Sequence, residues 1–291
     1  MTREIAVLTN PTSGKGRAAG LDHEVVRRLR DGGVMVRKLQ GRNAQEAREL
    51  AESCVADGVD TLVVVGGDGM VHLAVQALAG TQTALGVIPA GTGNDVARFF
   101  DIPRDDPAAA TRTVLAGTTT TIDLGRAGPT YFISVMAGGL DAIVNERVNK
   151  MAWPKGPMRY SIATVAALTR FRPIAYRVDV DGETMQFEAT TLAIGNTSSY
   201  GGGMRIAEGA DPTDGLLDLV VIGAGRRREL LRTFPLVFDG RHIDHPMVHR
   251  WRGRRITVAA AGITAYADGE PLAPLPLTVE VVPSALRIIT P

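Results

Sequence analysis

The segment Val63-Val64-Val65-Gly66-Gly67-Asp68-Gly69-Met70 has the pattern of a strand that ends in a glycine turn. Apolar residues at helical spacing follow at once, from Val71 to Leu78. Such a strand–loop–helix points the N–H groups of the turn and of the helix N-terminus beyond the strand, where they favour phosphate. The segment is therefore either a phosphate site that also holds the Asp68 carboxylate, or a tight turn with Asp68 as the helix N-cap.

The same alternation continues on both sides of this segment and predicts an α/β domain with a parallel sheet over residues 1–125. Apolar runs predict strands at 5–8, 34–36, 61–65 and 85–88, and helical spacing predicts helices at 21–29, 44–56, 71–78, 96–99 and 106–116. Polar loops follow the first, third and fourth strands. In open parallel sheets ligands bind at the carboxyl ends of the strands, so the three loops point to one binding edge.

Each of the two flanking loops is weak evidence alone. The loop 10–17 is polar and basic but lacks the first glycine and the Lys-Ser/Thr ending of a P-loop. The loop 89–95 contains Gly91-Thr92-Gly93 without the third glycine of a dinucleotide site, and a plain turn capped by Asn94 or Asp95 is the alternative. Their convergence at one edge carries the argument.

The pattern changes near residue 125, and strand signals dominate residues 126–283. We expect an antiparallel β-sandwich domain with added helices, and a return of residues 284–291 to the first domain. The expected strands are 118–124, 131–135, 176–180, 184–193, 216–222, 256–260 and 264–267, and the expected helices are 140–151 and 158–171.

Composition limits the class of protein. The net charge of +1 argues against a nucleic-acid partner. We expect the single cysteine, Cys54, to be a small buried hydrophobe in a cytoplasmic protein. We see neither a leader nor an apolar run of roughly 18 residues, so we expect membrane contact to be peripheral.

Several motifs, in this order along the chain, resemble the catalytic-domain pattern of the diacylglycerol kinase and sphingosine kinase superfamily, most closely the soluble bacterial lipid kinases. They are Asn10-Pro11-Thr12-Ser13-Gly14, Gly66-Gly67-Asp68-Gly69, Gly91-Thr92-Gly93-Asn94-Asp95, Asp123-Leu124-Gly125, Gly201-Gly202-Gly203-Met204, Asp211-Pro212-Thr213-Asp214-Gly215-Leu216 and Asp268-Gly269-Glu270. The resemblance covers nearly the whole chain and implies an ATP-binding α/β domain (1–125) followed by a lipid-substrate domain (126–283).

The resemblance also implies roles for individual residues. The ATP site would be lined by Asn10, Pro11, Thr12, Ser13, Gly14, Gly66, Gly67, Asp68, Gly69, Met70 and Thr92. Asp68, Asp95 and Asp123 would form an acidic network around Mg²⁺ near the transferred phosphate. The Asp214 carboxylate and the carbonyls of Asp211 and Leu216 would bind a structural metal. Glu270 would be the general base, with Asp68 as second candidate.

Two positions depart from the family pattern. Met70 stands where a threonine is common, and Gly41 aligns loosely with a nucleotide-contacting threonine. Both departures bear on nucleotide affinity, although the backbone cradle does not depend on these side chains.

The second half contains motifs with simpler alternatives. Without the resemblance, the segment 211–215 is an ordinary turn, and Asp268-Gly269 is a hairpin turn beside a solvated Glu270. His242, His245 and His249 invite a zinc interpretation, but polar loop residues near an acceptor pocket are favoured because no matched ligand set accompanies them. The arginines of 226–228 and 250–255 suggest a surface for anionic lipid headgroups, with a solvated basic face as the alternative.

The leading hypothesis is a kinase, dependent on ATP and Mg²⁺, that phosphorylates a lipid hydroxyl at the inner face of the membrane, as a monomer or homodimer. Diacylglycerol is the first candidate acceptor, and a sphingoid or other bacterial lipid alcohol is the next. The alternatives are an NAD kinase-like enzyme and a catalytically silent lipid-binding protein of the same fold.

Overall fold

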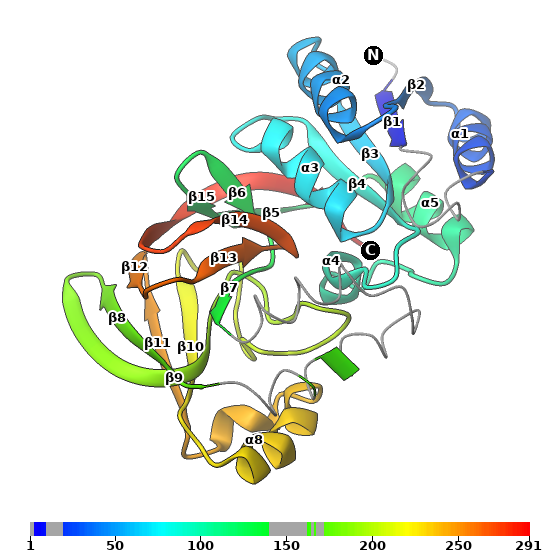
Figure 1. Ribbon diagram of the computed structural model, residues 1–291. Coiled ribbons are helices and arrows are strands. Elements are labelled where there is room, and N and C mark those ends of the chain that lie inside the picture. Colours follow the sequence, from blue (N-terminus) through cyan, green and yellow to red (C-terminus); the bar gives the residue numbers. More distant parts are fainter. Residues whose placement is uncertain (1–2, 10–19, 140–161, 164–165, 167–171) are drawn as a thin grey trace. The chain divides into compact units, whose positions relative to one another are not determined.

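The computed structural model describes residues 3–9, 20–139, 162–163, 166 and 172–291 (Figure 1). The loop from Asn10 to Gly14 and most of the expected helices 140–151 and 158–171 lie outside these residues. The chain forms two compact units, Met1–Leu124 with Pro283–Pro291, and Gly125–Val282. An ATP-binding role for the first unit and a lipid-substrate role for the second stay predictions.

The first unit is built on a parallel sheet in the order β2-β1-β3-β4, extended by the end of β15, where Arg287 pairs with Ala84. The register Val64↔Val87 and Gly66↔Pro89 brings the carboxyl ends of β3 and β4 together. The elements are β1 (Glu4–Thr9), α1 (Leu21–Asp31), β2 (Met35–Gln40), α2 (Ala44–Ala56), β3 (Thr61–Gly66), α3 (Asp68–Leu78), β4 (Ala84–Pro89), α4 (Asp95–Phe99), α5 (Pro107–Ala116) and the last residues of β15 (Leu277–Ile289).

Helices cover both faces of this sheet: α1 packs with α5, and α2 packs with α3 (Figure 1). Both β3 and β4 are buried along their whole length, as expected for parallel strands covered on two faces. Side chains cap two of the helices, because Asn43 accepts the Glu46 N–H and Asp106 accepts the Ala109 N–H, both at 2.9 Å. Cys54 is buried, which raises its pKa to about 11 and confirms it as a small core residue.

The second unit is antiparallel. β9 pairs with β8 through its first half and with both β7 and β10 through its second half, so the sheet branches there. The elements are the end of β5 (Thr119–Ala127), β6 (Thr130–Phe132), β7 (Val135–Gly139), β8 (Ile174–Val180), β9 (Glu183–Gly195), β10 (Leu217–Gly223), α8 (Arg227–Thr233), the 3₁₀ helices η2 (Phe234–Val237) and η3 (Arg241–Asp244), β11 (Val248–Gly253), β12 (Arg255–Ala259), β13 (Thr264–Ala267), β14 (Glu270–Pro274) and the start of β15.

Alternate residues of β10 enter two separate cores. Leu219 and Val221 belong to one cluster, and Val220 and Ile222 belong to the other. Because side chains alternate along a strand, this arrangement buries both faces of β10. The expected fold class, parallel α/β followed by antiparallel β with added helices, is confirmed.

Two local expectations were wrong. The single strand expected at 131–135 is divided into β6 and β7, because the N–H groups of Ile133 and Ser134 bind the Asp268 carboxylate instead of a neighbouring strand. The polar loop expected around His242 is a 3₁₀ helix in which that side chain is fully buried, with Nε2 3.0 Å from the Ile206 carbonyl. Burial lowers the pKa of His242.

Candidate active site

Two glycine loops meet where β3 and β4 end. The Ala90 N–H donates to the Gly66 carbonyl at 2.8 Å. A Cβ added to Gly91 would lie 2.4 Å from the Gly67 Cα, and one added to Gly67 would lie 2.9 Å from the Gly91 Cα. Neither position has room for a side chain, so the close approach of the two loops requires glycine at both.

Asp68 joins the two loops through its side chain. It is the first residue of α3, and Gly67 is the N-cap, so the alternative of Asp68 as N-cap is wrong. Its Oδ1 instead accepts the Asp95 N–H at 2.7 Å and the Val96 N–H at 3.4 Å, at the start of α4. The half-buried Asp68 carboxylate therefore holds the first turn of a helix that begins 27 residues later in the chain.

Asn94 shapes the second loop. Its backbone is left-handed (φ 51°), and its side-chain amide closes onto the Gly91 N–H at 3.0 Å and the Gly91 carbonyl at 3.1 Å. Asp95 follows as the first residue of α4 and is buried, with the Arg98 Nε 3.8 Å from its Oδ1. The structure thus brings together Gly67, Asp68 and Asp95, three of the residues named for phosphate and metal binding.

The remaining residues of the predicted ATP site differ in exposure. Gly69 and Thr92 are exposed, whereas Met70 is only 5% exposed and faces the core side of α3. The Met70 side chain is thus part of the packing of the first unit.

Gly41 is also explained by packing. A Cβ at this position would lie 2.6 Å from the backbone N of Ala47 in α2. Met70 and Gly41, the two departures from the family pattern, are thus both accounted for by local packing.

Asp123 is 4% exposed, and its Oδ1 accepts the Ser284 N–H at 2.7 Å. This bond joins β5 to the C-terminal segment that returns to the first unit. The acidic network of Asp68, Asp95 and Asp123 stays a prediction.

The predicted structural-metal loop forms two side-chain turns. Asp211 accepts the Thr213 N–H at 2.9 Å, and Asp214 accepts the Leu216 N–H at 3.0 Å. The Asp214 carboxylate also pairs with Arg252, which lies 3.4 Å from Asp218 through its Nε. Burial raises the pKa of Asp218 against the opposing effect of Arg252 and Arg250.

In the part of the chain that the structure describes, no group of three or more His, Cys, Asp or Glu side chains is arranged to hold a metal ion. In the same residues, no helix is long and apolar enough to cross a membrane.

Asp268 and Gly269 connect β13 to β14 with φ values of 52° and 86°, as in a type I′ hairpin turn. The Asp268 carboxylate accepts the N–H groups of Ile133 at 3.1 Å and Ser134 at 2.8 Å. Sequence reasoning missed this positioning role, although the Asp-Gly pair marked the turn. Glu270 follows on β14 and is exposed, and its side chain makes no hydrogen bond or ion pair with any described residue.

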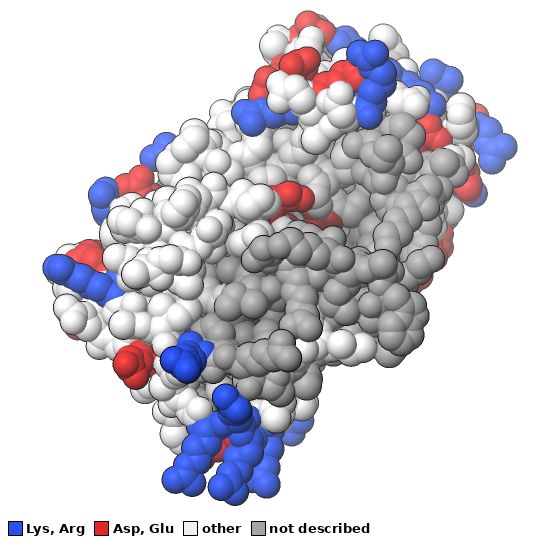
Figure 2. Space-filling view, in the orientation of Figure 1, with Lys and Arg blue, Asp and Glu red and all other residues white. Residues whose placement is uncertain are grey.

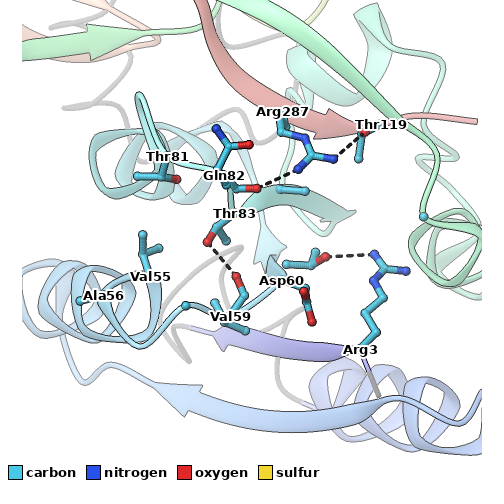
Figure 3. Close-up of a pocket in the computed structure, with 14 residues that line it drawn as sticks. Arg3, Val55, Ala56, Val59, Asp60, Thr81, Gln82, Thr83, Thr119 and Arg287 are labelled. Atoms are coloured by element: carbon cyan, nitrogen blue, oxygen red, sulfur yellow. Dashed lines mark hydrogen bonds between the residues drawn. The ribbon is translucent and has the colours of Figure 1, made fainter. Parts of the chain in front are cut away.

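A pocket of about 600 Å³ lies at the opposite edge of the first unit's sheet (Figure 3). Its lining includes Thr61 and Ala84, where β3 and β4 begin, and the arginines Arg3 and Arg287. Arg287 donates to the Gln82 carbonyl at 3.1 Å and to the Thr119 hydroxyl at 3.3 Å (Figure 3). This pocket is not the predicted nucleotide site, because the glycine loops follow the other ends of the same strands.

Comparison with known proteins identifies both halves. The family model described as diacylglycerol kinase catalytic domain matches residues 4–127. The model described as YegS C-terminal NAD kinase beta sandwich-like domain matches residues 134–290.

The similarity to curated relatives extends over the full chain. A diacylglycerol kinase of Mycobacterium tuberculosis (strain ATCC 25618 / H37Rv) is 45% identical over 294 residues, which cover 99% of this chain and 95% of that protein. One of Bacillus subtilis (strain 168) is 28% identical over 268 residues, with 91% and 88% covered. The crystal structure of a diacylglycerol kinase from Bacillus anthracis str. Sterne shares the fold, with a TM-score of 0.77 at 19% identity over 99% of this chain and 97% of that one. The chain therefore belongs to the diacylglycerol kinase family and is a kinase.

Proposed function

We propose that this kinase transfers the γ-phosphate of ATP to the hydroxyl of a membrane lipid alcohol, with diacylglycerol as the acceptor and phosphatidic acid as the product. The observation that carries the proposal is the Asp68 carboxylate at the junction of two glycine loops, bonded to the start of α4. Phosphoryl transfer needs mainly positioning and neutralisation of charge. At this junction backbone N–H groups would position the phosphates, and the Asp68 carboxylate would help to hold the Mg²⁺ that neutralises their charge.

The ATP polyphosphate would be held by backbone N–H groups of the loop Gly66 to Met70, with Thr92 and the residues Asn10, Pro11, Thr12, Ser13 and Gly14 completing the site. The tight approach of Gly67 and Gly91 supports this role, since bare backbone is what a phosphate contacts in such loops. The buried Met70 side chain contributes to packing rather than to nucleotide contact.

The donor set near Asp68 suits Mg²⁺, which prefers carboxylate oxygens and water. Asp68 and Asp95 belong to loops that are in direct contact, and we propose them, with Asp123, as the residues that orient the ion. The bound ion would supply charge neutralisation at the transferred phosphate. A second, structural ion at Asp211, Asp214 and Leu216 would have to compete with Arg252, which already pairs with Asp214.

We propose Glu270 as the general base. Its carboxylate is exposed and has no partner among the described residues, whereas Asp68 is engaged by the N–H groups of α4. Glu270 would accept the proton of the acceptor hydroxyl as that oxygen bonds to the γ-phosphorus and the bond to the β–γ bridging oxygen breaks, with ADP as the leaving group. Asp68 is the second candidate for the same role.

A lipid acceptor places the reaction at a membrane surface. We therefore propose a cytoplasmic protein that associates peripherally with the inner face of the membrane, and both a monomer and a homodimer are compatible with this role.

The decisive experiment incubates the protein with γ-labelled ATP and Mg²⁺ against diacylglycerol, a sphingoid base, phosphatidylglycerol and NAD in parallel. We expect label in the organic phase with diacylglycerol and its loss on chelation of Mg²⁺. Label on NAD would replace the proposal by the NAD kinase-like alternative, and label on a sphingoid base would correct the acceptor. Absence of label with every acceptor would support a silent lipid-binding protein.

A further inference from the structure

The second unit contains two arginine-rich segments whose charges differ in availability. In the segment 250–255, Arg250 lies 3.4 Å from Asp218, Arg252 pairs with Asp214 and Asp218, and Arg255 lies 2.7 Å from Glu280. Acidic side chains of the same unit thus neutralise most of this segment. It is a poor candidate for the lipid-headgroup surface that its sequence suggested.

The segment 226–232 retains its charge. Arg226, Arg227, Arg228 and Arg232 are all exposed, and none forms an ion pair with a described residue. The acidic residue among them, Glu229, accepts the backbone N–H of Arg226 at 2.9 Å. In Figure 2 one group of blue side chains lies at the lower end of the view, where Figure 1 shows α8.

Exposed apolar side chains accompany these arginines. The described residues include four large apolar side chains that are exposed, and two of them are Leu231 in α8 (39%) and Phe238 (41%), directly after η2. Phe238 contacts Phe234 edge to face, with ring centroids 5.6 Å apart. Leu230 and Phe234 pack against a core of the second unit and anchor the segment.

The spacing within α8 places charge and apolar surface together. Leu231 is four residues after Arg227 and three after Arg228, which are the separations of neighbours on a helix surface. Water is an unfavourable environment for the exposed side chains of Leu231 and Phe238, and it provides no anion for the arginines beside them. A bilayer with anionic headgroups suits both kinds of side chain, because arginines bind the headgroup phosphates and apolar side chains insert at the boundary of the acyl chains.

We propose that α8 and the following turn, with Arg227, Arg228, Leu231, Arg232 and Phe238, form the surface by which this protein docks on membranes that contain anionic lipids. The proposal deepens the proposed function, because it rests on an acceptor that resides in a membrane. Its partner is the lipid surface itself, independent of the catalytic residues.

The test is sedimentation with vesicles of phosphatidylcholine, with and without 30% phosphatidylglycerol, a composition of roughly the anionic content that gives appreciable surface potential. We expect the wild-type protein to bind the anionic vesicles and to be released by salt. The double variant Arg228→Glu/Arg232→Glu should bind at least about 25-fold more weakly, at roughly fivefold for each arginine lost. Leu231→Ser/Phe238→Ser should weaken binding at low and high salt alike.

Two control variants make the same kinds of change, in charge and in exposed apolar surface, at residues outside α8 and the following turn. Arg27→Glu/Arg30→Glu makes the same charge change at exposed residues of α1, and Met35→Ser removes another exposed apolar side chain. Both controls should bind vesicles like wild type. Equal losses in variants and controls, or wild-type binding that ignores the anionic lipid, would overturn the proposal.

Kinase assays with a short-chain, water-dispersed diacylglycerol separate this inference from the proposed function. We expect the α8 variants to keep wild-type activity in that assay and thermal melts like wild type. Failure of the wild-type protein to phosphorylate any lipid would remove the proposed function, whereas the vesicle result would still decide the docking surface.

Discussion

Two Asp–Gly pairs, Asp68-Gly69 followed by Met70 and Asp268-Gly269 followed by Glu270, differ in the use of their side chains. Both aspartates accept backbone N–H groups from a distant segment of their own unit. The residue that follows the pair is buried after Asp68-Gly69 (Met70) and exposed after Asp268-Gly269 (Glu270). Asp68 and Gly69 begin helix α3, whereas Asp268 and Gly269 form the turn before strand β14, and this difference in local geometry leaves Met70 buried and the Glu270 side chain exposed.

The most severe test of this comparison is Asp68→Asn. The amide oxygen can still accept the Asp95 N–H, so we expect the fold to survive. We expect kcat to fall by about 10³-fold, because the neutral amide would hold the proposed Mg²⁺ at the phosphate more weakly than the carboxylate. Steady-state kinetics and thermal melts are the measurements. The matched variant Asp268→Asn should keep kcat within about threefold, and equal losses in the two variants would break the comparison.

Glu270→Gln tests the other carboxylate. The exposed Glu270 carboxylate is the proposed general base. We therefore expect its replacement by an amide to lower kcat by about 10²-fold and to leave KM for ATP nearly unchanged. The readout is kcat measured separately from KM. A variant with wild-type kcat would return the role of base to Asp68.

Asp268→Ala probes the positioning role of the turn between β13 and β14. The change leaves the Ile133 and Ser134 N–H groups without this acceptor and places alanine at a φ of 52°, so we expect destabilisation of about 2 kcal/mol. Chemical denaturation with an unchanged m-value measures it. A stability equal to wild type would show that these N–H groups find other acceptors.

Met70→Leu should have the smallest effect. A volume-conserving change in a packed core costs less than about 1.5 kcal/mol, and a side chain that faces the core should leave KM for ATP within about twofold. Nucleotide titration measures this directly. A large rise in KM would mean that the position contacts the nucleotide, as the family pattern with threonine suggests.

Sequence patterns predicted the secondary structure well where burial is complete. The run Val63 to Val65 is part of a strand buried along its whole length, and its apolar side chains report that burial directly. The patterns were less informative for strands at the edge of a sheet. The strand expected at 34–36 is β2, which extends to Gln40 through Arg37 and Lys38, because an edge strand tolerates charged residues. The division between β6 and β7 was not predictable, because it depends on a carboxylate 135 residues away.

For the candidate site and the basic segments, too, some features were predictable from the sequence and others were not. The glycine and aspartate loops were visible in the sequence, and so was their place at one sheet edge. Which arginines are neutralised was not visible: Arg252 pairs with Asp214, whereas Arg228 and Arg232 remain unpaired among the described residues, although the two segments look equally basic.

The sequence by itself determined the alternation of strands and helices in the first unit and the glycine loops that follow β3 and β4, because periodicity and turn chemistry depend on residues within about four positions of one another. It did not predict α8, β11 or β14 of the second unit. Only the tertiary structure decided that Asp68 holds α4, that Asp268 holds the β6–β7 connection, and that α8 keeps its charge exposed. These outcomes depend on hydrogen bonds and ion pairs between segments far apart in the chain, whose partners are selected by the packing of the whole unit.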